Sequence, residues 1–158
     1  MNTTQTKNGF TIIEVVLVLA IAGLIFLMVF IALPALQRGQ RDSQRRDDVA
    51  RVNTQLQNYQ SSARGSVPTS TTAFGTFVSN YITPHQDEYQ DPQQGNYTLS
   101  YQDATSSGKP SKGQIWYTNR AVCSTDGTGS VTAVTSTRSY ALRIFLEGQD
   151  APYCIDNR

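Results

Sequence analysis

One stretch of apolar sequence, residues 10–36, constrains this chain more than any other feature. It holds 27 residues, of which only Glu14 is charged. A helix of that length rises about 40 Å, whereas the hydrocarbon core of a bilayer is about 30 Å thick. The segment is therefore long enough to span a membrane with some tilt.

Glu14 is the unusual residue of this segment. An ionised carboxylate among apolar side chains is costly unless a cation pairs with it. Lys7 lies seven residues before Glu14, across Gly9, and Arg38 lies at the other end of the helix. Because an isolated helix offers Glu14 no cation, we expect its partner to come from outside its own helix. Glu14 is therefore a candidate functional residue.

The residues around Glu14 carry a resemblance to a known family. The sequence KNGFTIIE at residues 7–14, followed by the unbroken apolar run, resembles the class III signal of type IV prepilins and pseudopilins. In that signal a short polar leader ends in Gly, and the mature chain begins with Phe and has Glu at its fifth position. An ordinary secretory signal is instead cut after its apolar region. The alternative interpretation is a plain signal anchor in which Glu14 has no role.

The resemblance implies a particular maturation. A prepilin peptidase would cut between Gly9 and Phe10 and methylate the new amine of Phe10, and Gly9 suits this step because a residue without Cβ lets a protease approach closely. The precursor would sit in the cytoplasmic membrane with its C-terminal domain outside. An assembly platform and a motor ATPase would then build it into an extracellular filament, which makes the chain a homo-oligomer.

The distribution of cations argues against that topology. Lys7 precedes the span, but four arginines follow it closely: Arg38, Arg41, Arg45 and Arg46. The positive-inside rule alone would place the C-terminal domain in the cytoplasm. We give precedence to the leader motif and to the cysteines described below.

Two residues, Gly23 and Pro34, weaken the long helix. Pro34 leaves the carbonyl of Phe30 without its N–H partner and usually kinks a helix. In filaments of the family the stretch between a similar Gly and Pro tends to lose helical form, although Pro34 comes later than is usual. The alternative is an ordinary kinked membrane helix.

Residues 37–64 are polar, with six arginines and three aspartates. Apolar side chains nevertheless recur at spacings of three and four and predict an amphipathic helix: Val49, Val52, Leu56 and Tyr59. We expect this helix to continue the first one and to pack beneath a C-terminal domain. The aspartates interleaved in the basic stretch 38–51 favour a salt-bridged, solvated or subunit-facing surface over contact with lipid or DNA.

Residues 65–158 predict one small domain. Four sequences rich in β-branched and aromatic residues, with turn residues between them, predict three antiparallel strands and a short last one: NYTLSYQ, QIWYTNRAVC, SYALRIFLEG and APYCIDN. TFVSNYI predicts a short helix or turn. Residues 83–96 predict a polar loop, and residues 124–138 a loop too long for a tight hairpin.

The predicted fold is therefore α+β, with a long N-terminal helix packed on a small antiparallel sheet. Residues 1–9 form the leader, 10–36 the membrane or filament-core helix, 37–64 the amphipathic continuation and 65–158 the β domain.

Both cysteines, Cys123 and Cys154, belong to the last domain. An even count in an exported chain predicts a disulfide. The pair also resembles the disulfide-bounded C-terminal loop of many pilins. The alternative is two unlinked thiols in a bacterium that does not oxidise its exterior.

No pattern in the sequence predicts catalysis, a metal site or a cofactor. The single histidine, His85, stands in a polar loop without a nucleophile or carboxylate pattern. Asp126-Gly127 lacks the acidic spacing of a Ca²⁺ loop, and Asn96-Tyr97-Thr98 is only a formal glycosylation sequon. Residues 66–158 hold six Lys and Arg against eight Asp and Glu, which does not indicate nucleic-acid binding by this domain alone.

Together these features predict a structural subunit of a type IV pilus that polymerises through its N-terminal helix for adhesion or motility. One alternative is a minor pilin or pseudopilin of a secretion or DNA-uptake machine. Another, of a different class, is a single-span anchored surface domain that binds a ligand and never polymerises. Abundant fibres in sheared surface material favour the first, trace amounts the second and none the third.

Maturation gives the first testable prediction. We expect the mature chain to begin at an N-methylated Phe10, and Gly9→Val to block the cut because a branched side chain stands where the peptidase must approach. Intact-mass spectrometry of surface fibres measures this directly. Fibres that retain Met1 would show that the motif does not direct cleavage.

Overall fold

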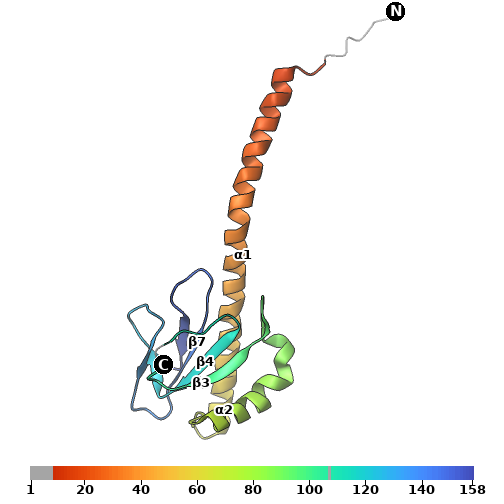
Figure 1. Ribbon diagram of the computed structural model, residues 1–158. Helices are drawn as coiled ribbons and strands as arrows, with labels where there is room; N and C mark the ends of the chain where they lie inside the picture. The colour runs from red at the N-terminus through yellow and green to blue at the C-terminus, as the bar shows by residue number, and fades with distance from the viewer. Residues whose placement is uncertain (1–8, 107) are drawn as a thin grey trace, which may run out of the picture. The chain divides into compact units, whose positions relative to one another are not determined.

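The computed structural model describes residues 9–106 and 108–158. The predicted leader therefore lies outside the described residues, apart from Gly9. The chain divides into two compact units, Met1–Gln37 and Arg38–Arg158. One helix, α1 (Ile12–Ser62), contributes residues to both units (Figure 1).

The first unit is the apolar part of α1. Its large apolar side chains are all exposed, from 45% at Val29 to 85% at Phe10. By length and composition α1 can cross a membrane, and none of its most apolar window is buried by the described part of the chain. The helix runs without a break through Gly23 and Pro34. The loss of helix predicted for that stretch concerns the assembled filament and stays a prediction.

The second unit begins with the polar part of α1, and its predicted amphipathic stripe is confirmed. Val49, Val52 and Leu56 are fully buried, and Tyr59 packs against the same core. Spacings of three and four residues place these side chains on one side of the helix. That side faces the sheet, because the same core cluster contains Ile115 and Leu142, which are strand residues.

Short helical segments connect α1 to the sheet. α2 (Thr71–Phe77) begins at Ser70, whose Oγ accepts a hydrogen bond from the N–H of Ala73 at 3.2 Å. A π-helical turn, η1 (Val78–Ile82), and a 3₁₀ helix, η2 (Thr83–Glu88), follow. The short helix or turn predicted for TFVSNYI is confirmed, and Phe77 and Ile82 are buried in the core.

The segment predicted as a polar loop, residues 83–96, is more regular than expected. After η2 it forms a small antiparallel hairpin of β1 (Gln90–Asp91) and β2 (Gly95–Asn96). The polar sequence did not reveal these elements, because most of their side chains face solvent.

The main sheet has four strands in the order β3-β4-β7-β8. They are β3 (Thr98–Gln102), β4 (Gln114–Asn119), β7 (Tyr140–Ile144) and β8 (Tyr153–Asp156). β7 pairs antiparallel with both of its neighbours. β3 and β4, however, are parallel, with Thr98 opposite Gln114, so the prediction of antiparallel strands is wrong for this pair. The intervening residues 103–113 are long enough to return the chain to the same end of the sheet.

The sequence QIWYTNRAVC, predicted to be one strand, forms two strands. β4 ends at Asn119, and Arg120 has a φ of 50°, a left-handed conformation that turns the backbone. The next strand, β5 (Ala121–Cys123), pairs instead with β6 (Val131–Ala133) in a separate two-stranded sheet. β6 lies within the segment that was predicted to be a loop.

One face of the main sheet packs against α1. Buried tyrosines on that face each find a hydrogen-bond acceptor, as such hydroxyls require. The hydroxyl of Tyr140 donates to Asn53 Oδ1 at 2.8 Å, and that of Tyr117 donates to the Pro68 carbonyl at 2.7 Å. The predicted α+β fold, a long helix on a small sheet, is therefore confirmed, and the sheet is mixed rather than purely antiparallel.

A disulfide joins the β5–β6 sheet to the main sheet. It links Cys123 of β5 to Cys154 of β8, with 5.8 Å between the two Cα atoms. The carboxylate of Asp156 accepts a hydrogen bond from the N–H of Cys123 at 2.8 Å, next to the disulfide. The small β5–β6 hairpin is thus held to the edge of the main sheet covalently and by a hydrogen bond.

We expect Cys154→Ser to lower the free energy of unfolding by roughly 3–4 kcal/mol, because the cross-link restricts the unfolded chain. Urea unfolding of the full chain in detergent measures the change. Wild-type protein in reductant is the matched control and should lose the same stability, whereas the variant should not respond to reductant. Maleimide labelling of both cysteines in the native protein would contradict the linkage.

Candidate processing and assembly site

The N-terminus of α1 is capped by Thr11. Its carbonyl accepts hydrogen bonds from the N–H groups of Glu14 at 3.1 Å and of Val15 at 3.3 Å. Its Oγ1 also accepts from the N–H of Glu14, at 3.4 Å. Thr-x-x-Glu is the sequence of a capping box, and an acidic side chain in the first turn complements the helix dipole. This second role for Glu14 was not predicted from the sequence, although the Thr-x-x-Glu spacing is visible there.

The predicted cleavage bond lies just before this cap. Gly9, Phe10 and Thr11 are not helical, and Gly9 and Phe10 are both exposed. A Cβ placed on Gly9 would meet no atom of the described structure within 4 Å. The fold itself therefore does not require glycine at this position. A requirement for Gly9 would come from the peptidase.

Glu14 lies on an apolar groove of the helix. The groove is open to the surroundings, has a volume of about 290 Å³ and is lined by Phe10, Glu14, Val15, Val18 and Leu19. Among the described residues, no Lys or Arg nitrogen lies within 4.0 Å of the Glu14 carboxylate. A cation that pairs with Glu14 must therefore be brought to this groove.

In the second unit, a buried group of charges holds α1 to the β domain. Arg45 of α1 is fully buried, and its Nε lies 2.6 Å from Asp91 Oδ2 of β1. Its Nη1 lies 2.7 Å from Glu147 Oε1, in the loop after β7, and 3.2 Å from Asp42 Oδ1. We call this set, with Arg41, the Arg45 cluster.

Further hydrogen bonds complete the cluster. Arg41 binds both carboxylate oxygens of Glu147, at 2.9 and 2.7 Å. The two oxygens of Asp42 accept from the backbone N–H groups of Glu147 and Gly148, each at 2.8 Å. Bidentate and charge-assisted bonds of this kind are the strong ones. The cluster thus ties α1, β1 and the loop after β7 together.

The pKa values in the cluster reflect this pairing. Hydrogen bonds from Arg41, and then from Arg45, outweigh burial and lower the pKa of Glu147 to about 2. Burial would raise the pKa of Asp91, but the Arg45 hydrogen bond and two backbone N–H groups lower it. Burial would lower the pKa of Arg45, and its bonds to Asp91 and Glu147 raise it instead. All three groups are therefore ionised at neutral pH.

Only part of this cluster was predicted from the sequence. The basic stretch 38–51 was expected to be salt-bridged, solvated or subunit-facing, and Arg41 and Arg45 form ion pairs. The burial of Arg45 was not predicted, nor that its partners Asp91 and Glu147 come from the β domain. The burial of Arg45 could have been inferred from its position, because Arg45 lies four residues before Val49 on the buried stripe.

Other candidate features lie apart from these two places. His85 is exposed, with its Nδ1 3.9 Å from Glu88 Oε1. Across residues 9–106 and 108–158, no group of three or more His, Cys, Asp or Glu side chains is placed to hold a metal ion.

The fold and the N-terminal geometry define a chain in which an exposed apolar helix continues into an α+β unit. A family model described as the prokaryotic N-terminal methylation motif matches residues 5–30. The chain thus carries the class III signal of type IV pilins and prepilins, which confirms the predicted resemblance. No curated protein and no solved structure matched the chain.

The motif points to a structural protein of the pilin-like or pseudopilin type. It implies processing by a prepilin peptidase and assembly into pilus-like polymers. Together with the apolar helix, it is consistent with anchoring in a membrane before assembly.

The Arg45 cluster predicts an acid-sensitive stability. Because the pKa of Glu147 falls from its ordinary value of 4.5 to about 2 on folding, its contribution is complete above about pH 4.5 and is lost as the pH falls toward 2. We expect Glu147→Gln to flatten the fall in urea midpoint over this range. Glu88→Gln, which changes an exposed carboxylate, is the matched control and should keep the wild-type pH profile. Equal profiles for all three proteins would contradict the assignment.

Proposed function

We propose that this chain is a structural subunit that polymerises through the apolar part of α1 into a type IV pilus for adhesion or motility. The observation that supports this most strongly is an exposed apolar helix that directly follows a methylation motif. Lipid can cover such a surface in the precursor, and the same surface of other subunits can cover it in a filament. A minor pilin or pseudopilin would share these features, and the abundance of the subunit in sheared fibres distinguishes them.

The proposal includes a defined route to the filament. A prepilin peptidase cuts between Gly9 and Phe10 and methylates Phe10, the C-terminal unit lies outside the cytoplasmic membrane, and an assembly platform driven by a motor ATPase extracts the subunit. The exposed, non-helical Gly9–Phe10 bond supports the first step. The disulfide between Cys123 and Cys154 supports an exported C-terminal unit.

In this proposal Glu14 pairs with the amine that cleavage creates on Phe10. The amine of an incoming subunit meets Glu14 of a subunit already in the filament. Each charge is costly to keep unpaired in apolar surroundings, and pairing compensates both. The groove beside Glu14, with apolar walls and no cation among the described residues, supports this role.

Packing of the apolar helices alone does not drive extraction from the membrane, because lipid is about as apolar as the neighbouring helices. The work is therefore assigned to the motor. The charge pair then acts as a register device that favours one axial stagger over the slipped alternatives. Within the filament, the stretch between Gly23 and Pro34 is the proposed place for the helix to loosen.

Variants at two positions, Glu14 and Thr11, separate the charge pair from the helix cap. Glu14→Ala and Glu14→Gln remove the charge and should leave membrane insertion intact while fibre yield falls sharply, by about tenfold or more if pairing is worth 1.4 kcal/mol or more. Thr11→Ala removes the capping hydroxyl and keeps the charge, so its fibre yield should stay near wild type. Fibre yield is measured in sheared surface fractions against total subunit.

If Glu14 acts only as a capping residue, Thr11→Ala and Glu14→Gln would reduce assembly to a similar degree. If the proposal is wrong altogether, Glu14→Gln fibres would form at wild-type yield and with unchanged helical symmetry. A chain that inserts in the membrane but forms no fibres even as wild type would instead support the anchored binding domain.

A further inference from the structure

The second face of the main sheet, away from α1, carries a buried arginine that has no counter-ion among the described residues. Arg143 of β7 is 2% exposed and stands opposite Trp116 of β4, with its guanidinium 5.2 Å from the centre of the Trp116 ring. Its Nη1 donates to the carbonyl of Gly108 at 3.0 Å. No carboxylate of the described residues lies within 4.0 Å of it.

The other donors of Arg143 are unmatched. Nε and Nη2 are both buried, and neither has a hydrogen-bond partner among the described residues. The hydroxyl of Thr118 is the third buried group of this kind. Register places Thr118 opposite Ala141, two residues from Arg143 on the same face, so the two side chains are diagonal neighbours across β4 and β7. The unmatched polar groups of the described chain thus gather at one place on the sheet.

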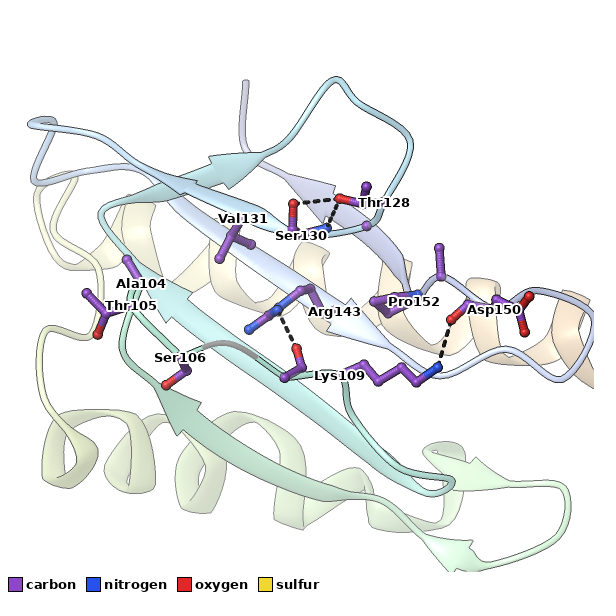
Figure 2. Close-up of a pocket in the computed structure, with 13 residues that line it drawn as sticks. Ala104, Thr105, Ser106, Lys109, Thr128, Ser130, Val131, Arg143, Asp150 and Pro152 are labelled. Atoms are coloured by element: carbon purple, nitrogen blue, oxygen red, sulfur yellow. Dashed lines mark hydrogen bonds between the residues drawn. The ribbon is translucent and has the colours of Figure 1, made fainter.

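A pocket opens at this place. It has a volume of about 480 Å³ and lies between β7, the β5–β6 hairpin and the loop residues 104–106, 108–109 and 150–152. Figure 2 shows the Arg143 guanidinium lying between Val131 on one side and the segment that carries Ser106 on the other. Hydroxyls of Ser106, Thr128 and Ser130 line the walls.

The charges around the pocket are predominantly positive. Lys109 lines it and donates from Nζ to the carbonyl of Asp150 at 3.0 Å, which leaves its charge uncompensated by that contact. The carboxylate of Asp150 is the one negative group among the described lining residues, and Asp150 is exposed. Burial lowers the pKa of Arg143, which shows that its charge is poorly compensated in the present surroundings.

We propose that this pocket binds a small oxyanion, a phosphate or carboxylate group carried by a polar molecule of about the size of a sugar phosphate. Arg143 and Lys109 supply the positive charge, and the hydroxyl of Ser106 supplies a neutral hydrogen bond. The hydroxyls of Thr128 and Ser130 are engaged within the hairpin, because Thr128 Oγ1 donates to Asp126 Oδ1 at 2.7 Å and lies 2.7 Å from Ser130 Oγ. A planar guanidinium with two donors that no described residue uses matches the two oxygens of such a group. Both donors are covered in the present structure, so the anion reaches them by displacing the groups that cover them. A buried charge without a partner is costly, so an entering anion gains what the folded chain leaves unmatched.

The walls of the pocket are set by close packing. Gly129 has a φ of 63°, and a Cβ there would collide with the Pro152 carbonyl oxygen. A Cβ on Gly108 would lie 3.2 Å from the Trp116 ring. The loop of Gly129 therefore packs closely against the loop of Pro152, and the loop of Gly108 packs closely against Trp116 of the sheet. The pocket lies within the C-terminal unit alone. The inference does not depend on whether the chain forms filaments.

Trp116 is the only tryptophan of the chain, so its fluorescence reports on this site. We would titrate the full chain in nonionic detergent with inorganic phosphate, glucose 6-phosphate, glucuronate and glucose, with NaCl at matched ionic strength. We expect a saturable change with at least one of the three anions and none with glucose or NaCl. Comparing the affinities for glucose 6-phosphate and glucuronate distinguishes a phosphate site from a carboxylate site. Comparing glucose 6-phosphate with inorganic phosphate shows whether the sugar contributes to binding.

Three variants test which residues hold the anion. Arg143→Gln should weaken binding by about tenfold or more, because a charge-assisted hydrogen bond is lost. Lys109→Gln changes an exposed side chain, so it keeps the fold and should weaken binding by a few fold. Lys112→Gln is the matched control, because this substitution removes the same charge from the same loop at a residue that does not line the pocket. The affinity of this variant for the anion should be unchanged.

Other results would overturn the proposal. A change in fluorescence that follows ionic strength alone would show a general salt effect and no anion site in the pocket. Titrations in which none of the anions gives saturable binding would also overturn the proposal. Equal affinities for wild type and Lys109→Gln, with Arg143→Gln either equal or unfolded, would place the binding elsewhere on the chain.

Discussion

The buried guanidinium of Arg45 is the contact on which the C-terminal unit most depends. The apolar stripe of Val49, Val52 and Leu56 attracts the sheet to α1, but hydrophobic contact is not directional. The ion pairs to Asp91 and Glu147 are directional, and they come from two segments far apart in the chain. Removing one partner of such a pair typically costs about 3–5 kcal/mol, because the remaining charge stays buried. The cluster therefore determines where along α1 the β domain packs.

This arrangement lets one helix meet two different surroundings. From residue 38 onward α1 is amphipathic and its buried side is used by the β domain. Before residue 37 the helix is apolar on every side, and all of its large side chains are exposed. Such a surface is stable only in lipid or against similar surfaces, so the first unit requires an environment that the chain itself does not provide. Glu14 is the single point at which that environment must also supply a positive charge.

The parts of the fold that depend on periodicity could be predicted from the sequence. The length of the apolar run predicted the membrane-compatible helix, and the spacing of Val49, Val52 and Leu56 predicted the packing face. Strand pairing could not be predicted in the same way, because alternation of side chains does not encode whether β3 and β4 are parallel. The split of one predicted strand at Arg120 depends on a backbone conformation that most residue types avoid, and no signal in the sequence indicates it there.

The candidate sites show the same division. The cleavage motif is local, so residues 7–14 sufficed to predict it, and the Thr11–Glu14 cap was visible in the same residues. Arg45 and Arg143 are different, because burial of a charge depends on partners that the fold brings from elsewhere. A sequence-based prediction places arginines at the surface, which is correct for most of them.

The two buried arginines differ in a way that separates structure from binding. Arg45 meets three carboxylates, Asp42, Asp91 and Glu147, and all of its charge is compensated inside the fold. Arg143 meets one backbone carbonyl and an aromatic ring, and two of its nitrogens have no partner among the described residues. If burial of charge served only stability in this domain, Arg143 would be expected to have a carboxylate beside it, as Arg45 has. A pocket of about 480 Å³ lies at that position instead. The uncompensated charge is therefore best explained by an anion that comes from outside the chain.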